Sequence, residues 1–209
     1  MKEIVIIGHK AATAPFSLND LPGAAGRMDI LCRCVSSALF LSHDLRRDVR
    51  VHIILKGPPD EPKAIRFDGS SIRYLSPDER SSASLIKKAL EKNVRNFWME
   101  STPGVSIRKG DFGNILHEIN KKVIYLCEGG EDIRGKRLAG TFDDTVFVLG
   151  DHLGLTGDEE KTIEEYEHEI VSIGPLSLHA DHCIVLLLNE LDRKEYLNRN
   201  VQSGEDDYS

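Results

Sequence analysis

The sequence lacks the long apolar run that a membrane-spanning helix needs. No apolar stretch reaches the roughly 18–20 residues required to cross a bilayer. The opening residues, MKEIVIIGHK, combine a charge with a short apolar run but have no small-residue cleavage site, so they predict a first strand and not a secretion signal. We therefore expect a cytoplasmic protein with no membrane partner.

Cysteine motifs are also missing. The chain has four cysteines, which form no CxxC pair and no disulfide-like framework: Cys32, Cys34, Cys127 and Cys183. Reduced thiols in a cytosolic fold are the simplest interpretation.

The sequence contains neither the GxGxxG fingerprint of dinucleotide-binding folds nor a Walker loop, which argues against a dinucleotide site or an NTPase. It does contain three apolar strand segments that each run into a glycine-bearing loop, at 122–130, 144–154 and 169–177. Strands that alternate with helices predict a mostly parallel sheet with helices on both faces. Because ligands of such sheets bind beyond the carboxyl ends of the strands, we expect these loops to bind a small molecule through backbone groups.

The apolar periodicity predicts the remaining elements. We expect strands at 3–8 and 49–56 and a short hairpin formed by 64–67 and 72–75. The motif SPDE at 76–79 is typical of a capping box that opens a helix. The predicted helices are 27–43, 76–94, 112–120, 157–169 and 179–196.

The charge is unevenly distributed along the chain. The net charge of −7 argues weakly against a nucleic-acid partner. Residues 1–110, however, carry 18 Lys and Arg against 12 Asp and Glu, whereas residues 111–209 carry 9 against 22. A basic half can face a polyanion while the rest of the molecule is acidic, although arginines that merely cover sheet edges would give the same count.

The segment IVSIGPLSLHADHCIVLLLNELDR (170–193) raises two possibilities. His179, His182 and Cys183 share one helical face, but a zinc site needs a fourth ligand and none is visible at short spacing, so we expect no metal. The histidines would then cap the helix or contact solvent. From Cys183 to Leu191 the helix is apolar nearly all round, so it must be covered on more than one side, by its own domain or by a second subunit.

Three separated stretches give the chain a specific resemblance. They are FSLNDLPGAAGRMDILCRCVSSALFLSHDLRRDVRVHIILKGPPDEPKAIRF, VFVLGDHLGLT and SIGPLSLHADHCIVLLLNELDR. Together they resemble the archaeal tRNA pseudouridine-54 N1-methyltransferases, the TrmY-like branch of the SPOUT superfamily, from the first strand to Arg193. The resemblance implies an α/β SPOUT-type trefoil-knotted fold, S-adenosylmethionine as the methyl donor, and a homodimer that acts on the TΨC arm of tRNA.

The resemblance also assigns the cofactor site. Glycine would let the backbone approach the adenosine closely, and the leucines would form an apolar wall, although such leucines also suit an ordinary core. The implied cofactor-binding residues are Leu126, Gly150, Ile173, Gly174, Pro175, Leu176, Ser177, Leu178 and Cys183.

Methyl transfer to N1 of pseudouridine requires the reactants to be positioned and the N1 proton to be removed. Asp20, on a glycine-rich loop, is our candidate acceptor, although Asn19 and Asp20 also suit a turn or a helix cap. Arg27 would hold a phosphate or the uracil oxygens through its planar donors. The expected substrate-binding residues are Asn19, Arg27, Arg33, Arg46 and Arg47.

We expect residues 1–198 to form one domain, with the knot in about 122–196 and a polar, flexible tail at 199–209. Two other functions remain open. The chain could be a ribosomal-RNA pseudouridine N1-methyltransferase of the sister SPOUT branch, or a non-catalytic protein of this fold that binds RNA or the cofactor. A metal sensor built on His179, His182 and Cys183 is a more distant alternative.

Overall fold

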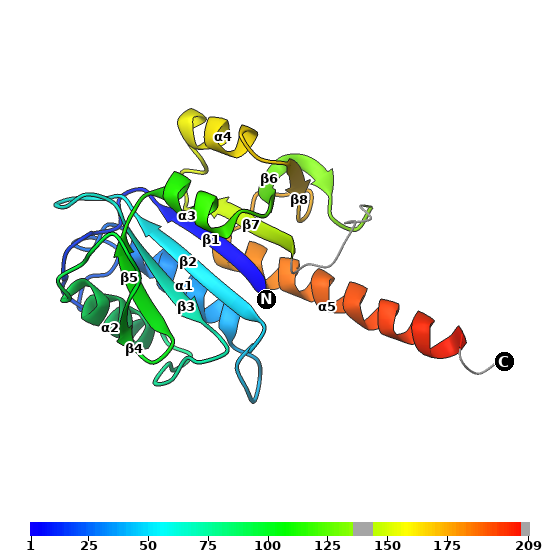
Figure 1. Cartoon of the computed structure of the whole chain (residues 1–209), viewed down its shortest axis with the longest axis horizontal. Helices are drawn as coiled ribbons and strands as arrows, with labels where there is room; N and C mark the ends of the chain where they lie inside the picture. Colours follow the sequence, from blue (N-terminus) through cyan, green and yellow to red (C-terminus); the bar gives the residue numbers. More distant parts are fainter. Residues whose placement is uncertain (136–143, 206–209) are drawn as a thin grey trace.

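A computed structural model describes residues 1–135 and 144–205 of the chain. Within these ranges, eight strands form a single sheet in the order β4-β5-β3-β2-β1-β7-β6-β8, and five helices cover it (Figure 1). The strands are β1 (Lys2–Gly8), β2 (Val49–Leu55), β3 (Lys63–Asp68), β4 (Met99–Thr102), β5 (Val105–Lys109), β6 (Lys122–Asp132), β7 (Thr145–Gly150) and β8 (His168–Ser172). The helices are α1 (Met28–Leu39), α2 (Glu79–Leu90), α3 (Phe112–Ile119), α4 (Gly157–Glu164) and α5 (Ala180–Glu205).

Half of the sheet is parallel. Strand β1 lies between β2 and β7, with Ile6 opposite both Ile53 and Leu149. β6 continues the parallel half beside β7, and β8 lies at its edge. Ile4 to Ile7 are completely buried, which is what a central strand with both faces covered requires. The expected α/β class is confirmed, with a sheet that is parallel from β2 to β8.

The other half of the sheet is antiparallel and differs from the sequence prediction. Strand β3 pairs with β2 and β5, and residues 72–75 form no strand, so the predicted hairpin of 64–67 and 72–75 is wrong. Tyr74 has a φ of 62°, which a strand residue cannot adopt. The real hairpin is β4–β5, which turns at Gly104, where φ is +78°.

Helices cover both faces of the sheet, as expected. Helices α1, α2 and α5 pack in one apolar cluster on one face, and α3 and α4 pack in a second cluster on the other (Figure 1). Helix α2 begins two residues later than the SPDE motif suggests. Its N-cap is Asp78, whose carboxylate accepts a hydrogen bond from Ser81 N at 2.8 Å.

Helix α5 is longer than predicted, and only part of its apolar surface is buried within this chain. One side, formed by Ile184, Leu187, Leu188 and Leu191, is buried in the same cluster as α1. The opposite side exposes Val185 and Leu186 by 49% and 41%. The distal part of the helix extends away from the sheet (Figure 1). It continues as helix to Glu205, and the last four residues of the expected tail lie outside the described residues.

No helix in the described residues is long and apolar enough to cross a membrane.

Candidate functional site

A cavity of about 790 Å³ opens at the carboxyl ends of β7, β6 and β8. The loops that follow these three strands form most of its wall, and the first turns of α1 and α5 complete it. Its size lies within the range typical of small-molecule sites. The cavity is therefore located where the three glycine-bearing loops predict a ligand.

Nearly all of the residues expected to bind the cofactor line this cavity. Pro175 is the exception, since it lies outside the lining although its neighbours on both sides belong to it. The expected residues that line the cavity are Leu126, Gly150, Ile173, Gly174, Leu176, Ser177, Leu178 and Cys183.

The two glycines singled out in the sequence have different structural reasons. A Cβ at Gly150 would lie 2.0 Å from the backbone oxygen of Gly154, so the tight turn of the loop requires glycine there whether or not a ligand binds. A Cβ at Gly174 would meet no protein atom within 4 Å. Of these two glycines, Gly174 is the one that leaves room for a ligand.

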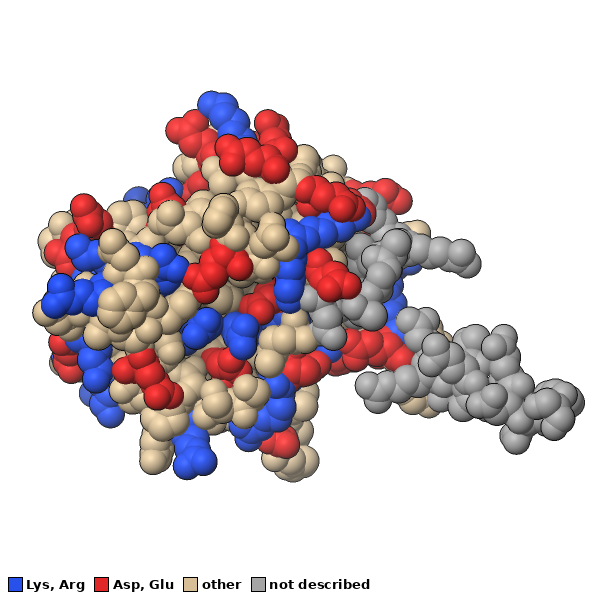
Figure 2. Space-filling model, viewed as in Figure 1, with Lys and Arg blue, Asp and Glu red and all other residues tan. Residues whose placement is uncertain are grey.

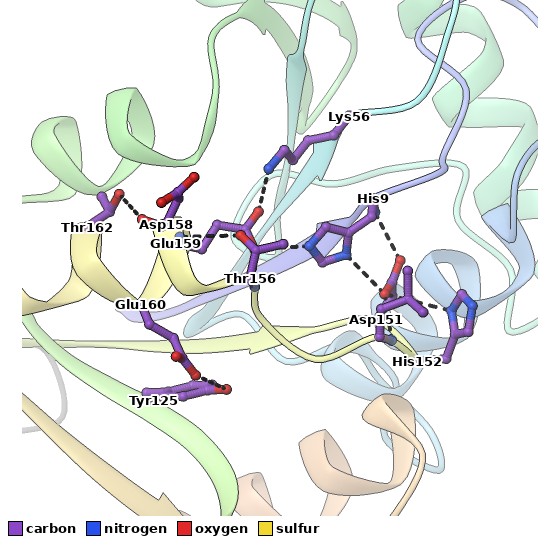
Figure 3. A network of polar contacts seen from close by, with 11 residues as sticks. His9, Lys56, Tyr125, Asp151, His152, Thr156, Asp158, Glu159, Glu160 and Thr162 are labelled. Carbon is purple, nitrogen blue, oxygen red and sulfur yellow. Dashed lines mark hydrogen bonds and ion pairs between the residues drawn. The ribbon is translucent and has the colours of Figure 1, made fainter.

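A buried polar network anchors the loop after β7 (Figure 3). Asp151 accepts hydrogen bonds from the backbone N–H groups of His9 and Leu153, both at 2.9 Å. The His9 ring lies between two carboxylates, with Nδ1 3.1 Å from Asp151 Oδ1 and Nε2 3.0 Å from Glu159 Oε2. Since Leu149 to Leu155 all line the cavity, this network fixes one of its walls.

Glu159, in the first turn of α4, has a strongly lowered pKa. Burial alone would raise its pKa, but hydrogen bonds from Lys56, Thr156 and His9 outweigh that effect and lower the pKa to about 2. Lys56 Nζ donates to Glu159 Oε1 at 2.5 Å, and Thr156 N donates to Oε2 at 2.8 Å. Glu159 is thus a permanent anion at neutral pH.

A second charged cluster lies where α1 and α5 begin. Arg27 donates twice to Asp29, each time at 3.0 Å, and Arg33 donates to the same carboxylate at 3.1 Å. Burial would raise the pKa of Asp29, but the two guanidinium groups lower it overall. Both arginines also line the cavity, so they present positive charge at its mouth.

Asp181 is a functional candidate that our sequence analysis missed. It is only 6% exposed, it lines the cavity, and its Oδ1 has no hydrogen-bond partner. The nearest cation to its other oxygen is Arg33, at 3.7 Å. A buried carboxylate oxygen without a partner is costly, so this atom is suited to accept a hydrogen bond from a ligand. In the sequence its only signal is its position between the two histidines of HADHC.

The structure places Asp20 and Asn19 outside the cavity lining. Both residues are exposed, on the loop before α1. The two carboxylate oxygens of Asp20 accept hydrogen bonds from Gly23 N and Ala24 N, each at 2.9 Å. In this arrangement Asp20 caps a turn, which is the alternative that its Asn-Asp context leaves open.

Arg46 and Arg47 lie at the opposite edge of the sheet, directly before the start of β2. Arg46 forms two hydrogen bonds with Asp192 of α5, at 2.9 and 2.5 Å. Arg47 donates to the backbone oxygen of Gly69 and to Asp44. A seven-residue strand separates this edge from the cavity, a distance of about 20 Å.

The histidines of HADHC lie at the start of α5. The rings of His179 and His182 stack, with centroids 5.5 Å apart, and both residues are exposed. Burial, reinforced by the charge of Asp181, raises the pKa of the Cys183 thiol, which therefore stays neutral. Among the described residues, no group of three His, Cys, Asp or Glu side chains is placed to hold a metal ion.

Charged side chains are unevenly distributed over the face of the molecule drawn in Figure 2. Acidic side chains gather over α4, at the top of the view, whereas basic and acidic side chains are mixed over β2, β3 and β5.

The comparisons with known proteins are consistent with this site. A family model described as SAM-dependent RNA methyltransferase, where SAM is S-adenosylmethionine, matches residues 1–196. A Methanosarcina acetivorans protein named tRNA (pseudouridine(54)-N(1))-methyltransferase is 58% identical over 207 residues, which are 98% of this chain and 97% of that protein. A Methanococcoides burtonii protein of the same name is 57% identical over 197 residues, 92% of this chain and 96% of that one.

The fold has a solved counterpart. The structure of Archaeoglobus fulgidus Nep1 bound to S-adenosylhomocysteine superposes with a TM-score of 0.65 and covers 92% of this chain and 98% of its own. The sequence identity is 17%, so the likeness concerns the fold.

Proposed function

The chain belongs to the SAM-dependent RNA methyltransferase family, and on this premise we propose that it methylates N1 of pseudouridine at position 54 in the TΨC arm of tRNA. The observation that carries the proposal is the 57–58% identity to two proteins of that name over at least 92% of this chain. The cavity at the strand ends supplies a place for the cofactor and the base.

The residues that line the cavity fit S-adenosylmethionine. Leu126, Ile173 and Leu178 offer an apolar wall for the adenine, and the open space beside Gly174 lets the ligand contact the backbone. The unpartnered Oδ1 of Asp181 is suited to a ribose hydroxyl or to the ammonium group of the cofactor. When bound, the cofactor supplies a methyl group on a positively charged sulfur that is already activated for transfer.

Two arginines would orient the RNA. Arg27 and Arg33 keep part of their guanidinium surface accessible, with side chains 39% and 31% exposed, while Asp29 fixes their direction. The planar donor fork of arginine suits a phosphate or the uracil oxygens. Arg46 and Arg47, at the far edge, would at most contact a distant part of the tRNA and position it without reading bases.

The N1 proton needs an acceptor, and two carboxylates compete for the role. Asp20 remains a candidate if its loop rearranges when RNA binds, because both of its oxygens cap the turn in this structure. Asp181 already lies in the cavity wall with one oxygen unpartnered. A single experiment on both residues distinguishes them.

We also propose that the enzyme is a homodimer. Apolar side chains are exposed on the outer side of α5 and on the neighbouring β8 loop, which includes Leu176 at 73% and Leu178 at 40%. Val185 and Leu186 of α5 are exposed as well, and exposed apolar side chains of this size are typical of protein interfaces. A second subunit would cover the side of α5 that its own domain leaves open.

The contact between α5 and the connection that leaves β6 supports a knot in about 122–196. Lys194 Nζ donates to the backbone oxygen of Ile133 at 2.7 Å, and Ile133 is buried in the same cluster as Leu188 and Leu191. The rest of this connection, 136–143, lies outside the described residues, so an experimental structure that traces it tests whether α5 passes through the loop.

We place this single domain in the cytoplasm, together with its tRNA.

The substrate prediction is all-or-none. Pseudouridine is joined to its ribose through carbon, which leaves N1 as an N–H, whereas in uridine the sugar occupies N1. We expect methylation of tRNA that carries pseudouridine at position 54 and none of the same tRNA with uridine there, measured by tritiated-cofactor transfer and nucleoside mass spectrometry. Small-subunit rRNA fragments with pseudouridine are the comparison, and a preference for them would favour the sister branch. Cofactor binding without transfer to any of these RNAs would indicate a non-catalytic protein.

The cofactor prediction uses Gly174. Gly174→Val adds a branched side chain whose Cβ meets no protein atom within 4 Å, so the variant should fold normally and lose cofactor affinity. Gly157→Val, whose Cβ also meets nothing within 4 Å but which lies outside the cavity lining, is the matched control. Calorimetry should show weaker binding for Gly174→Val alone. Equal affinities in both folded variants would place the cofactor elsewhere.

The proton-acceptor prediction compares Asp20→Asn with Asp181→Asn. Asparagine keeps the shape of the side chain but cannot take the proton, so the residue that accepts it should lose about 10²–10⁴-fold in turnover. If a residue only caps a turn, turnover of its Asn variant should decrease by much less than tenfold. If Asp181→Asn weakens cofactor binding and leaves turnover at saturation intact, Asp181 holds the cofactor and is not the acceptor.

The dimer prediction uses the exposed side of α5. The molar mass of the wild type, measured by light scattering, should be twice the 23.4 kDa of one chain. Leu186→Glu should give monomers, because a buried charge without a partner opposes association. Leu41→Glu, at a leucine that is 48% exposed on another surface, should remain dimeric. A monomeric wild type would refute the proposal.

A further inference from the structure

His9 lies directly after the central strand β1 and joins three separate segments of the cavity wall and its support (Figure 3). Its backbone N–H and its ring Nδ1 both contact the Asp151 carboxylate, and its ring Nε2 contacts Glu159 of α4. The His9 side chain is 12% exposed, while those of Asp151 and Glu159 are 2% and 5% exposed. His9 is not part of the cavity lining, so any effect on a ligand must pass through these partners.

Counting donors and acceptors determines the charge of the ring. An ionised carboxylate only accepts hydrogen bonds, and a neutral imidazole carries one N–H donor. Glu159 is ionised, because its pKa is about 2. Asp151 accepts backbone N–H groups at both of its oxygens, an arrangement that suits the ionised form. The contacts at 3.1 and 3.0 Å can therefore both be hydrogen bonds only if both ring nitrogens carry hydrogen.

The surrounding charges agree with an imidazolium at this position. Glu159 is neutralised by Lys56, which follows β2. Asp151 has His152 Nδ1 at 3.7 Å and, from the start of α1, a weaker attraction to Arg27. Neither places a full cation in hydrogen-bond contact with Asp151. A protonated His9 supplies that cation, and a neutral one would leave a lone pair facing a carboxylate oxygen.

We propose that His9, with both ring nitrogens protonated, is a positioning residue that holds the β7 loop in the shape that binds S-adenosylmethionine. The proposal rests on the proposed function, because it assumes that the cofactor occupies the cavity. Through Asp151, His9 fixes a loop whose residues 149–155 all line the cavity, and through Glu159 it ties that loop to α4.

The experiment compares three variants with the wild type by calorimetry with S-adenosylhomocysteine. His9→Leu removes both ring contacts and should weaken binding roughly tenfold, as the loss of charge-assisted hydrogen bonds does. His9→Asn keeps a donor near Asp151 and should weaken it less. In both variants the KM for tRNA should stay unchanged.

His52→Asn is the matched control. His52 is 2% exposed and its Nε2 lies 2.8 Å from Glu3, but it is not part of the cavity lining. Its loss should lower thermal stability without changing cofactor affinity. If the His9 variants bind like the wild type, or if His52→Asn weakens binding as much as they do, His9 has no positioning role.

A measurement on the wild type does not depend on how the variants fold. Nitrogen-15 NMR of the His9 ring near pH 6.5 should show both nitrogens protonated, and a neutral tautomer would overturn the proposal. Failure of the proposed function looks different, because the wild type itself would then bind no cofactor or would leave pseudouridine-containing tRNA unmethylated.

Discussion

The parallel pairing of β1, β7, β6 and β8 is the constraint from which the site follows. Strands that run in the same direction all end at the same edge, so three loops and the start of α5 must gather there. Loop backbone beyond the last ladder hydrogen bond has donors and acceptors that no neighbouring strand uses. The cavity between the loops after β7, β6 and β8 is a direct result, and its wall combines residues from Leu126 to Cys183.

The parallel half of the fold could be predicted because its signals are local. A fully buried strand such as Ile4–Ile7 is apolar at every position, and a glycine follows where the chain leaves the sheet. The antiparallel half could not, because short strands of similar composition compete for the same partners. The segment 72–75 has the alternation of a strand, yet the left-handed backbone at Tyr74 excludes it, and 99–102 pairs with β5 instead. The alternation of apolar and polar residues does not indicate the backbone angle φ of a single residue such as Tyr74.

The sequence predicts the site residues that lie together on one loop. It does not predict those that come together from distant segments. The cofactor loops are continuous in sequence, so most of their residues line the cavity. Arg46 was grouped with Arg27 by composition, but α1 separates them by 12 residues of helix, about 18 Å, and Asp192 takes up its charge. His9 and Glu159 become functional only because β1 and α4 meet, which no spacing rule reports. Asp181 is distinguished from the other buried acidic residues by its unpartnered Oδ1 in the cavity wall, which the sequence does not indicate.

The polar network behind the β7 loop explains how the side of the loop that faces the cavity can be apolar. A surface loop of this size is usually fixed by burying its own apolar side chains, yet Leu153 remains 54% exposed at the cavity. Its order comes instead from Asp151, whose oxygens are bonded to His9 and to the loop's own backbone. A buried carboxylate stabilises such an arrangement only when every acceptor is satisfied, since an unpaired one costs more than the contact provides. Because charge-assisted hydrogen bonds fix the loop from within, its apolar atoms remain available to a ligand.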